Sequence, residues 1–132
     1  MFFNKPVIED WNYQHFTREE MECHCGCGGV PTHEFMMCLE KLREHYAKPI
    51  VISSGYRCMK QNIKVGGVQD SAHTRGLAAD IKISGKEAYN LLHCAMELGF
   101  TGIGISQNGL PTKRFIHLDI VTGMMRPWLW SY

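Results

Sequence analysis

Two histidines and one aspartate in this chain have the residue types and spacing of a metal-binding site. His73 precedes Asp80 in the segment Ser-Ala-His-Thr-Arg-Gly-Leu-Ala-Ala-Asp-Ile-Lys-Ile, and His117 lies in Phe-Ile-His-Leu-Asp-Ile near the C-terminus. An unpaired carboxylate is costly to bury among the apolar neighbours of Asp80, and a metal ion is one partner that removes this cost. Two histidines and one carboxylate, with an open fourth position for water, are the ligand count of a catalytic zinc site.

The spacing of these residues leaves a second interpretation open. Residues 80–83 and 115–120 alternate apolar and polar side chains, as strands with one buried face do. On such a strand His117 and Asp119 point to the same face, because side-chain direction repeats every two residues. The histidines and the aspartate could therefore also be hydrogen-bonded core residues without a metal. The pattern is less specific than a His-Glu-x-x-His helix.

The elements that would position these residues predict an α+β fold. Helices are predicted at 17–20, 32–46 and 84–98, and each range begins with a possible capping residue. Strands are predicted at 49–53 (a short buried strand), 80–83, 101–106 and 114–121, with a polar loop over 58–71. A turn at 107–111 would join the last two strands as a hairpin. We therefore predict a small, mainly antiparallel sheet with helices packed on one face and the site on the other.

Length and composition restrict the class of protein. The chain has 132 residues, which is enough for a single domain over 1–132. A formal net charge of +1 gives no electrostatic reason to expect nucleic acid as a partner. No apolar run approaches the ~18 residues that span a bilayer, so we expect no membrane insertion. The N-terminus lacks the pattern of a signal peptide, which predicts residence in the cytoplasm.

Six cysteines are many for a chain of this length. Cys23, Cys25 and Cys27 alternate with other residues in Cys-His-Cys-Gly-Cys-Gly-Gly, which is not the Cys-x-x-Cys of common zinc knuckles. Half-cystines at i and i+2 rarely pair with each other, so a disulfide would have to reach a distant cysteine such as Cys58. Residence in the cytoplasm argues for reduced thiols. We favour a structural role for this cluster over the alternative of a second small zinc site.

Three motifs, taken in order, resemble the zinc D-Ala-D-Ala carboxypeptidases of the M15 family of peptidoglycan peptidases. They are Ser-Gly-Tyr-Arg at 54–57, Ser-Ala-His followed by a glycine and Ala-Asp at 71–80, and Phe-Ile-His-Leu-Asp at 115–119. The short forms in bacteriophages are most similar, because they also carry a Phe-Thr segment followed by Cys-x-Cys-Gly-Cys, as at 16–27. The resemblance spans about residues 15–122. It implies the fold shared by the DD-peptidases and the hedgehog signalling domain, which agrees with the predicted elements.

The resemblance implies a zinc enzyme that hydrolyses a peptide bond in the stem peptide or cross-link of bacterial peptidoglycan. The ligands of Zn²⁺ would be His73, Asp80 and His117. Arg57 would stabilise the oxyanion or anchor a substrate carboxylate. Tyr56 and Ser71 would contribute to the substrate cleft, Ser71 by a hydrogen bond near the zinc.

The chain departs from better-known members of that family at the general base. Many of them carry Glu or His two or three residues before the last zinc ligand, where this chain has Phe115 and Arg114. Asp119 is the nearest carboxylate. It could act as the base or as a group that orients His117, and we favour the base.

These implications lead to two functional hypotheses of different classes. The first is a phage endolysin or related cell-wall hydrolase, a monomer that accumulates in the host cytoplasm or, alternatively, travels with the virion. The second is a non-catalytic, zinc-stabilised module of the same fold that binds cell wall or protein. The bond cleaved by the enzyme stays open among the terminal D-Ala-D-Ala, a cross-link and the L-Ala-D-Glu bond.

Overall fold

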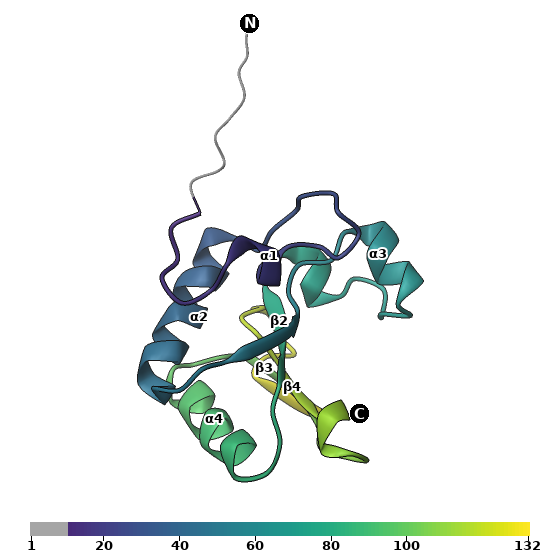
Figure 1. Cartoon of the computed structure of the whole chain (residues 1–132). Coiled ribbons are helices and arrows are strands. Elements are labelled where there is room, and N and C mark those ends of the chain that lie inside the picture. The colour runs from purple at the N-terminus through teal and green to yellow at the C-terminus, as the bar shows by residue number, and fades with distance from the viewer. Residues whose placement is uncertain (1–10) are drawn as a thin grey trace, which may run out of the picture.

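A five-stranded sheet in the order β1-β2-β4-β3-β5 is the centre of the fold. The computed structural model describes residues 11–132 (Figure 1). The strands are β1 (Val51–Ser54), β2 (Ala78–Lys82), β3 (Gly102–Ser106), β4 (Phe115–Asp119) and β5 (Trp128–Ser131). All neighbouring strands are antiparallel except β5, which runs parallel to β3. The predicted α+β fold with a mainly antiparallel sheet is confirmed, including the β3–β4 hairpin.

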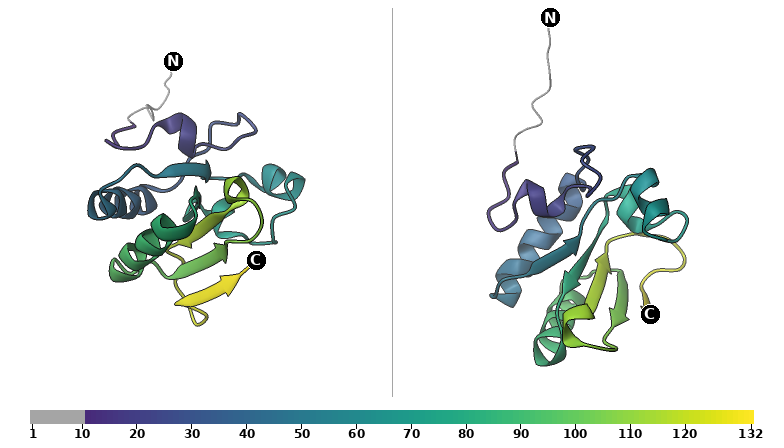
Figure 2. Two further views of the ribbon diagram at one scale, coloured as in Figure 1. Left: turned by 60° about the horizontal axis from the view of Figure 1, so that its bottom comes forward. Right: turned by 45° about the vertical axis from the view of Figure 1, so that its right-hand side comes forward.

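Helices lie on both sides of this sheet. The α-helices are α1 (Arg18–Met21), α2 (His33–Tyr46), α3 (Met59–Lys64) and α4 (Gly85–Glu97), and the short 3₁₀ turns are η1 (Ala72–Arg75) and η2 (Pro111–Lys113). The two long helices, α2 and α4, lie together on one side of the sheet, whereas α3 lies on the other side (Figure 2). Within residues 11–132, no helix combines the length and apolarity needed to cross a bilayer.

The helices that begin where the sequence predicted have capping residues at those positions. Thr17 Oγ1 accepts the backbone N–H of Glu20 at 3.2 Å, and Thr32 Oγ1 accepts that of Phe35 at 3.1 Å. Such an N-cap stabilises a helix by about 1 kcal/mol relative to alanine, because it satisfies a donor that has no partner within the helix. Ser84 precedes α4 but makes no capping hydrogen bond through its side chain.

Alternation along β2 and β4 separates the core from the opposite face of the sheet. Ile81, Ile116 and Leu118 are buried against the two long helices. Each such side chain contributes about 1.5–3 kcal/mol of hydrophobic free energy. The residues between them point to the other face, where Asp80 of β2 lies directly opposite His117 of β4 in the antiparallel register. The sheet therefore presents polar side chains on the face that α2 and α4 leave free.

Three local features differ from the prediction. Residues 58–71 were expected to form a loop, but α3 lies there; its apolar residues Met59 and Ile63 are exposed, so it has no buried stripe that a sequence pattern could reveal. The strand β5 was not predicted, because it is short and follows a proline. The strand at 49–53 was expected to be buried, but β1 is an edge strand and the side chain of Val51 is 56% exposed.

Candidate metal centre

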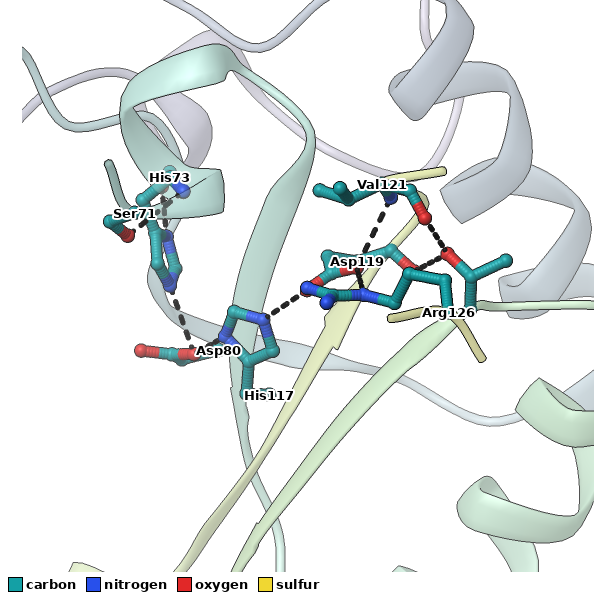
Figure 3. A network of polar contacts seen from close by, with 9 residues as sticks. Ser71, His73, Asp80, His117, Asp119, Val121 and Arg126 are labelled. Carbon is teal, nitrogen blue, oxygen red and sulfur yellow. Dashed lines mark hydrogen bonds and ion pairs between the residues drawn. The ribbon is translucent and has the colours of Figure 1, made fainter. Parts of the chain in front are cut away.

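The structure brings His73, Asp80 and His117 together from three segments that are separate in the sequence. His73 comes from η1 and the other two from paired positions on β2 and β4. Asp80 Oδ1 lies 3.1 Å from His73 Nε2 and 3.1 Å from His117 Nδ1 (Figure 3). The two imidazole rings are nearly perpendicular, with centroids 5.1 Å apart. One ligand atom from each residue therefore faces a common point.

Each imidazole has one nitrogen that faces the common point and one that is hydrogen-bonded elsewhere in the protein. The second nitrogen's hydrogen bond determines whether the first carries a lone pair. His73 Nδ1 lies 2.7 Å from the carbonyl oxygen of Gly55. Because a carbonyl can only accept, Nδ1 carries the proton and Nε2 is free to bind a cation. His117 Nε2 likewise lies 2.9 Å from the carboxylate of Asp119, which assigns the proton to Nε2 and the lone pair to Nδ1. A metal-binding histidine is commonly oriented in this way.

These three atoms are all electron-pair donors, so their close approach is stabilised by a divalent cation placed between them. Two neutral imidazole lone pairs and a carboxylate oxygen repel when they face one another. Relieving that repulsion with protons would require two buried imidazolium ions, whereas a single cation satisfies all three atoms. Ligands at 2.0–2.1 Å from a tetrahedral zinc are separated by about 3.3 Å, close to the 3.1 Å seen here. The donor set therefore fits zinc, with the side of the cavity open for a fourth ligand.

The electrostatics of the centre also favour a cation. Burial by itself raises the pKa of Asp80, but the close contacts with His117 and His73 lower it more, so that the pKa lies well below its ordinary value. Burial lowers the pKa of His117, but its hydrogen bond to Asp119 and the nearby carboxylate of Asp80 raise it above the ordinary value. The largely buried carboxylate of Asp80 thus stays ionised, and a positive charge beside it offsets the cost of its burial.

Asp119 is fully buried, and both of its oxygens have partners. Besides the bond with His117, Oδ2 pairs with Arg126 Nη2 at 3.2 Å, and Oδ1 accepts the N–H of Val121 at 3.1 Å. Burial raises the pKa of Asp119, but the hydrogen bonds from His117 and Arg126 lower it below its ordinary value. A general base needs an oxygen free for the attacking water, so the geometry favours the orienting role of the two roles predicted for Asp119.

Two glycines of β3 make space for this arrangement. Gly102 lies opposite Asp119 in the sheet, and a Cβ at Gly102 would overlap the Asp119 carboxylate. A Cβ at Gly104 would meet the indole of Trp130, which lies beside the ring of His117 at 5.1 Å between centroids. The glycines at alternate positions of a strand were the sequence signal of a close approach that the prediction missed.

A cavity of about 620 Å³ opens over the three ligands. One side comes from the segment 65–73 and the other from β4 and the C-terminal residues, including Trp130 and Tyr132. Arg57, for which a contact with the substrate was predicted, lines this cavity, and its buried Nε has no hydrogen-bond partner within the part of the chain that the structure describes. The cavity is thus large enough for a peptide segment and carries the positive charge of Arg57 on its wall.

Comparison of the sequence with known proteins assigns the chain to a family. A family model described as Peptidase M15 matches residues 14–119, a range that holds all three candidate ligands. The chain belongs to the M15 peptidase family. The peptidoglycan L,D-endopeptidase MepK of Escherichia coli strain K12 is 33% identical over 86 residues, which cover 61% of this chain and 44% of that protein. The MepK proteins of Escherichia coli O157:H7 and Shigella flexneri match to the same extent. The chain thus spans less than half the length of these relatives.

Of the two residues predicted to contribute to the substrate cleft, Ser71 lines the cavity and Tyr56 does not. Ser71 lines the cavity, and its Oγ accepts the N–H of His73 at 3.1 Å, so that it holds the start of η1. Tyr56 is not among the cavity-lining residues, because its ring packs against Gly29 in the cysteine loop. Arg126, which was not predicted, joins the site through its ion pair with Asp119; a contact between a loop residue and a strand residue leaves no periodic signal in the sequence.

Proposed function

We propose that this protein is a zinc-dependent peptidase that hydrolyses a peptide bond in the stem peptides or cross-links of bacterial peptidoglycan. The observation that carries the proposal is the convergence of two imidazole lone pairs and one carboxylate oxygen, 3.1 Å apart, at the base of an open cavity. Membership of the M15 family supports the reaction class. The peptidoglycan substrate is supported by the MepK relatives.

The residues of the centre have separate tasks in this proposal. His73 Nε2, His117 Nδ1 and one oxygen of Asp80 hold the metal. A zinc ion held by these residues would supply a bound water with a pKa of about 7 and Lewis-acid polarisation of the scissile carbonyl. Asp119 keeps the proton of His117 on Nε2, so that Nδ1 stays a ligand. Gly55 does the same for His73 through its carbonyl oxygen.

Arg57 is the residue we propose for recognition of negative charge on the substrate. The guanidinium of Arg57 lines the cavity, and its planar array of N–H donors suits a negatively charged oxygen. Two kinds of oxygen fit this donor. One is the oxyanion that develops during attack on the carbonyl, and the other is the terminal carboxylate of a stem peptide.

The position of the cleaved bond depends on whether Arg57 binds the oxyanion or the terminal carboxylate of the substrate. A carboxylate anchor would make the enzyme a carboxypeptidase of the D-Ala-D-Ala type, whereas an oxyanion contact is compatible with cleavage inside a peptide. The MepK relatives are named as L,D-endopeptidases, which supports internal cleavage. We further propose that the protein acts as an endolysin-type wall hydrolase, held in the host cytoplasm until it reaches the wall.

Purified peptidoglycan tests the proposal directly. We expect the wild-type protein to release new free amines, a chelator to stop the release, and added zinc to restore it. His73→Ala should lose zinc and activity together, whereas His93→Ala, at an exposed position on α4, should lose neither. Mass spectrometry of the digested muropeptides identifies the cleaved bond. Zinc-loaded protein that releases no amines from intact wall or from muropeptides would contradict the proposed reaction.

A non-catalytic binding module is the second candidate function. It is favoured by the absence of an evident general base: both oxygens of Asp119 are engaged within the described part of the chain, and the positions two and three residues before His117 hold Phe115 and Arg114. The same incubation distinguishes the two, because a module would sediment with peptidoglycan and leave the amine content of the wall unchanged.

A further inference from the structure

Four cysteines from two segments that are distant in the sequence meet beside the segment that carries Tyr56 and Arg57. Cys23, Cys25 and Cys27 lie in the loop after α1, and Cys58 is the N-cap of α3. The Sγ atoms of all four lie within 4.8 Å of one another. The Sγ of Cys25 is 3.4 Å from that of Cys23 and 3.6 Å from that of Cys58. The sequence separation of the two segments means that the fold, not the local spacing, creates this cluster.

These separations differ from those of disulfides and match those of sulfurs around one metal ion. All four cysteines are free thiols, and a disulfide would require sulfurs about 2.05 Å apart. Four thiolates at about 2.3 Å from a tetrahedral zinc are separated by about 3.8 Å. The Sγ distances of 3.4 and 3.6 Å lie close to that value. A four-sulfur tetrahedral set is selective for zinc or iron among the common metals.

The backbone around the cluster is shaped to hold the sulfurs in place. Gly26 and Gly28 have φ values of +86° and +85°, which residues with a Cβ rarely adopt, and they let the loop turn on either side of Cys27. The N–H of Cys23 donates to the carbonyl of Gly29 at 2.9 Å and closes the loop. The N–H of Cys58 points at the Sγ of Cys23 at 3.3 Å, as backbone donors do toward metal-bound thiolates.

We propose that Cys23, Cys25, Cys27 and Cys58 form a second, structural zinc site. Four protein ligands leave no open position for water, which is the arrangement of structural rather than catalytic zinc. Zinc is favoured over an iron–sulfur cluster because the sulfurs surround a point at single-ion distances. This site takes no direct part in the proposed peptidase reaction, since none of its ligands lines the cavity over His73.

The position of the cluster gives the second zinc a task. Cys58 directly follows Gly55, Tyr56 and Arg57. The carbonyl of Gly55 fixes the proton of His73, and the N–H of Arg57 donates to the carbonyl of His73 at 3.2 Å. The N–H of Tyr56 donates to Met21 at 2.9 Å, immediately before the cysteine loop. The structural zinc would therefore hold the segment that orients one catalytic ligand and carries the substrate-binding arginine.

Metal analysis of the full chain tests the proposal. Protein purified with zinc present should contain two zinc ions per chain, and the double variant Cys25→Ser/Cys27→Ser should lose one of them. His73→Ala should lose the other, so the two sites can be counted separately. Cys94→Ser, a matched substitution on α4 outside the cluster, should keep both. A wild-type protein with one zinc that the double cysteine variant retains would overturn the proposal, as would stoichiometric iron in the cluster.

Thiol reactivity gives a second readout that does not depend on activity or on the folding of a variant. Cys25 and Cys27 are exposed and would react quickly with a thiol reagent if they were free. We expect them to be protected in the zinc-loaded protein and to react when a chelator strong enough to strip the metal is added, with release of zinc in proportion. Rapid reaction of both before the chelator is added would refute the site, and so would a mass showing a disulfide.

Discussion

Replacing Asp119 by asparagine separates the two roles that the sequence left open for this residue. The substitution keeps the size of the side chain and removes its charge. In the wild-type protein, the carboxylate of Asp119 accepts hydrogen bonds from His117 Nε2, the N–H of Val121 and Arg126. The amide of asparagine offers one acceptor oxygen for these donors, so at least one of them loses its partner, and Arg126 loses its counter-ion.

The size of the effect follows from these contacts. Loss of a carboxylate that orients a metal-binding histidine typically weakens metal affinity 10–100-fold, which is about 1.4–2.8 kcal/mol. Breaking a buried ion pair by removing one partner costs about 3–5 kcal/mol. Arg126 is 20% exposed and can turn toward water, so we expect the free energy of unfolding of the metal-free protein to fall by about 3 kcal/mol, at the low end of that range.

Zinc competition with a chromophoric chelator, urea denaturation and amine release from peptidoglycan measure these quantities on one preparation. The matched control is Glu97→Gln, which removes a carboxylate from an exposed ion pair on α4 and should change none of them. An orienting role predicts weaker zinc binding and a turnover that zinc saturation largely restores. Unchanged zinc affinity with turnover abolished at saturating zinc would refute this reasoning and assign Asp119 as the general base.

Three further substitutions test other parts of the site and the fold. Arg57→Gln should lower kcat/KM on peptidoglycan by about 10²–10³-fold without loss of zinc, and Arg75→Gln, exposed on η1, should leave activity unchanged. Gly102→Ala should lower the free energy of unfolding by about 1–3 kcal/mol, as measured in urea, because the added methyl overlaps the Asp119 carboxylate. Hydrogen bonds from Tyr46 and Lys48 lower the pKa of Glu87 below its ordinary value. The stability contributed by ionised Glu87 is therefore complete above the ordinary pKa and is lost as the pH falls through the lowered pKa. The unfolding temperature of Glu87→Gln should therefore lie below wild type at neutral pH and approach it in acid.

The sequence predicted the parts of the fold where one face of an element is buried. The alternation around Asp80 and His117 located β2 and β4, and the threonine caps located α1 and α2. The helix α3 could not be predicted in the same way, because it buries only Gln61 and Asn62 and its N-cap is the thiol of Cys58. Its position depends on contacts with distant segments rather than on its own periodicity.

The candidate site shows the same division. Residue types and strand periodicity were enough to nominate the three ligands and to place Asp119 beside His117. They could not indicate which imidazole nitrogen faces the metal point, since that depends on the carbonyl of Gly55 and the carboxylate of Asp119. Nor could they show that Tyr56 turns toward the cysteine loop. Hydrogen bonds between segments decide these details, and such bonds have no fixed spacing in the chain.

The direct pairing of Asp80 with His117 has a consequence for attempts to re-engineer the protein. A shift of the β4 register by one residue relative to β2 would place His117 in the apolar core and Ile116 on the opposite, solvent-facing side of the sheet. Apolar packing and ligand alignment thus impose the same register, and a single deletion within the strand would violate both at once. Length changes aimed at altering specificity are therefore better placed between β3 and β4, where the connection is exposed and neither requirement applies.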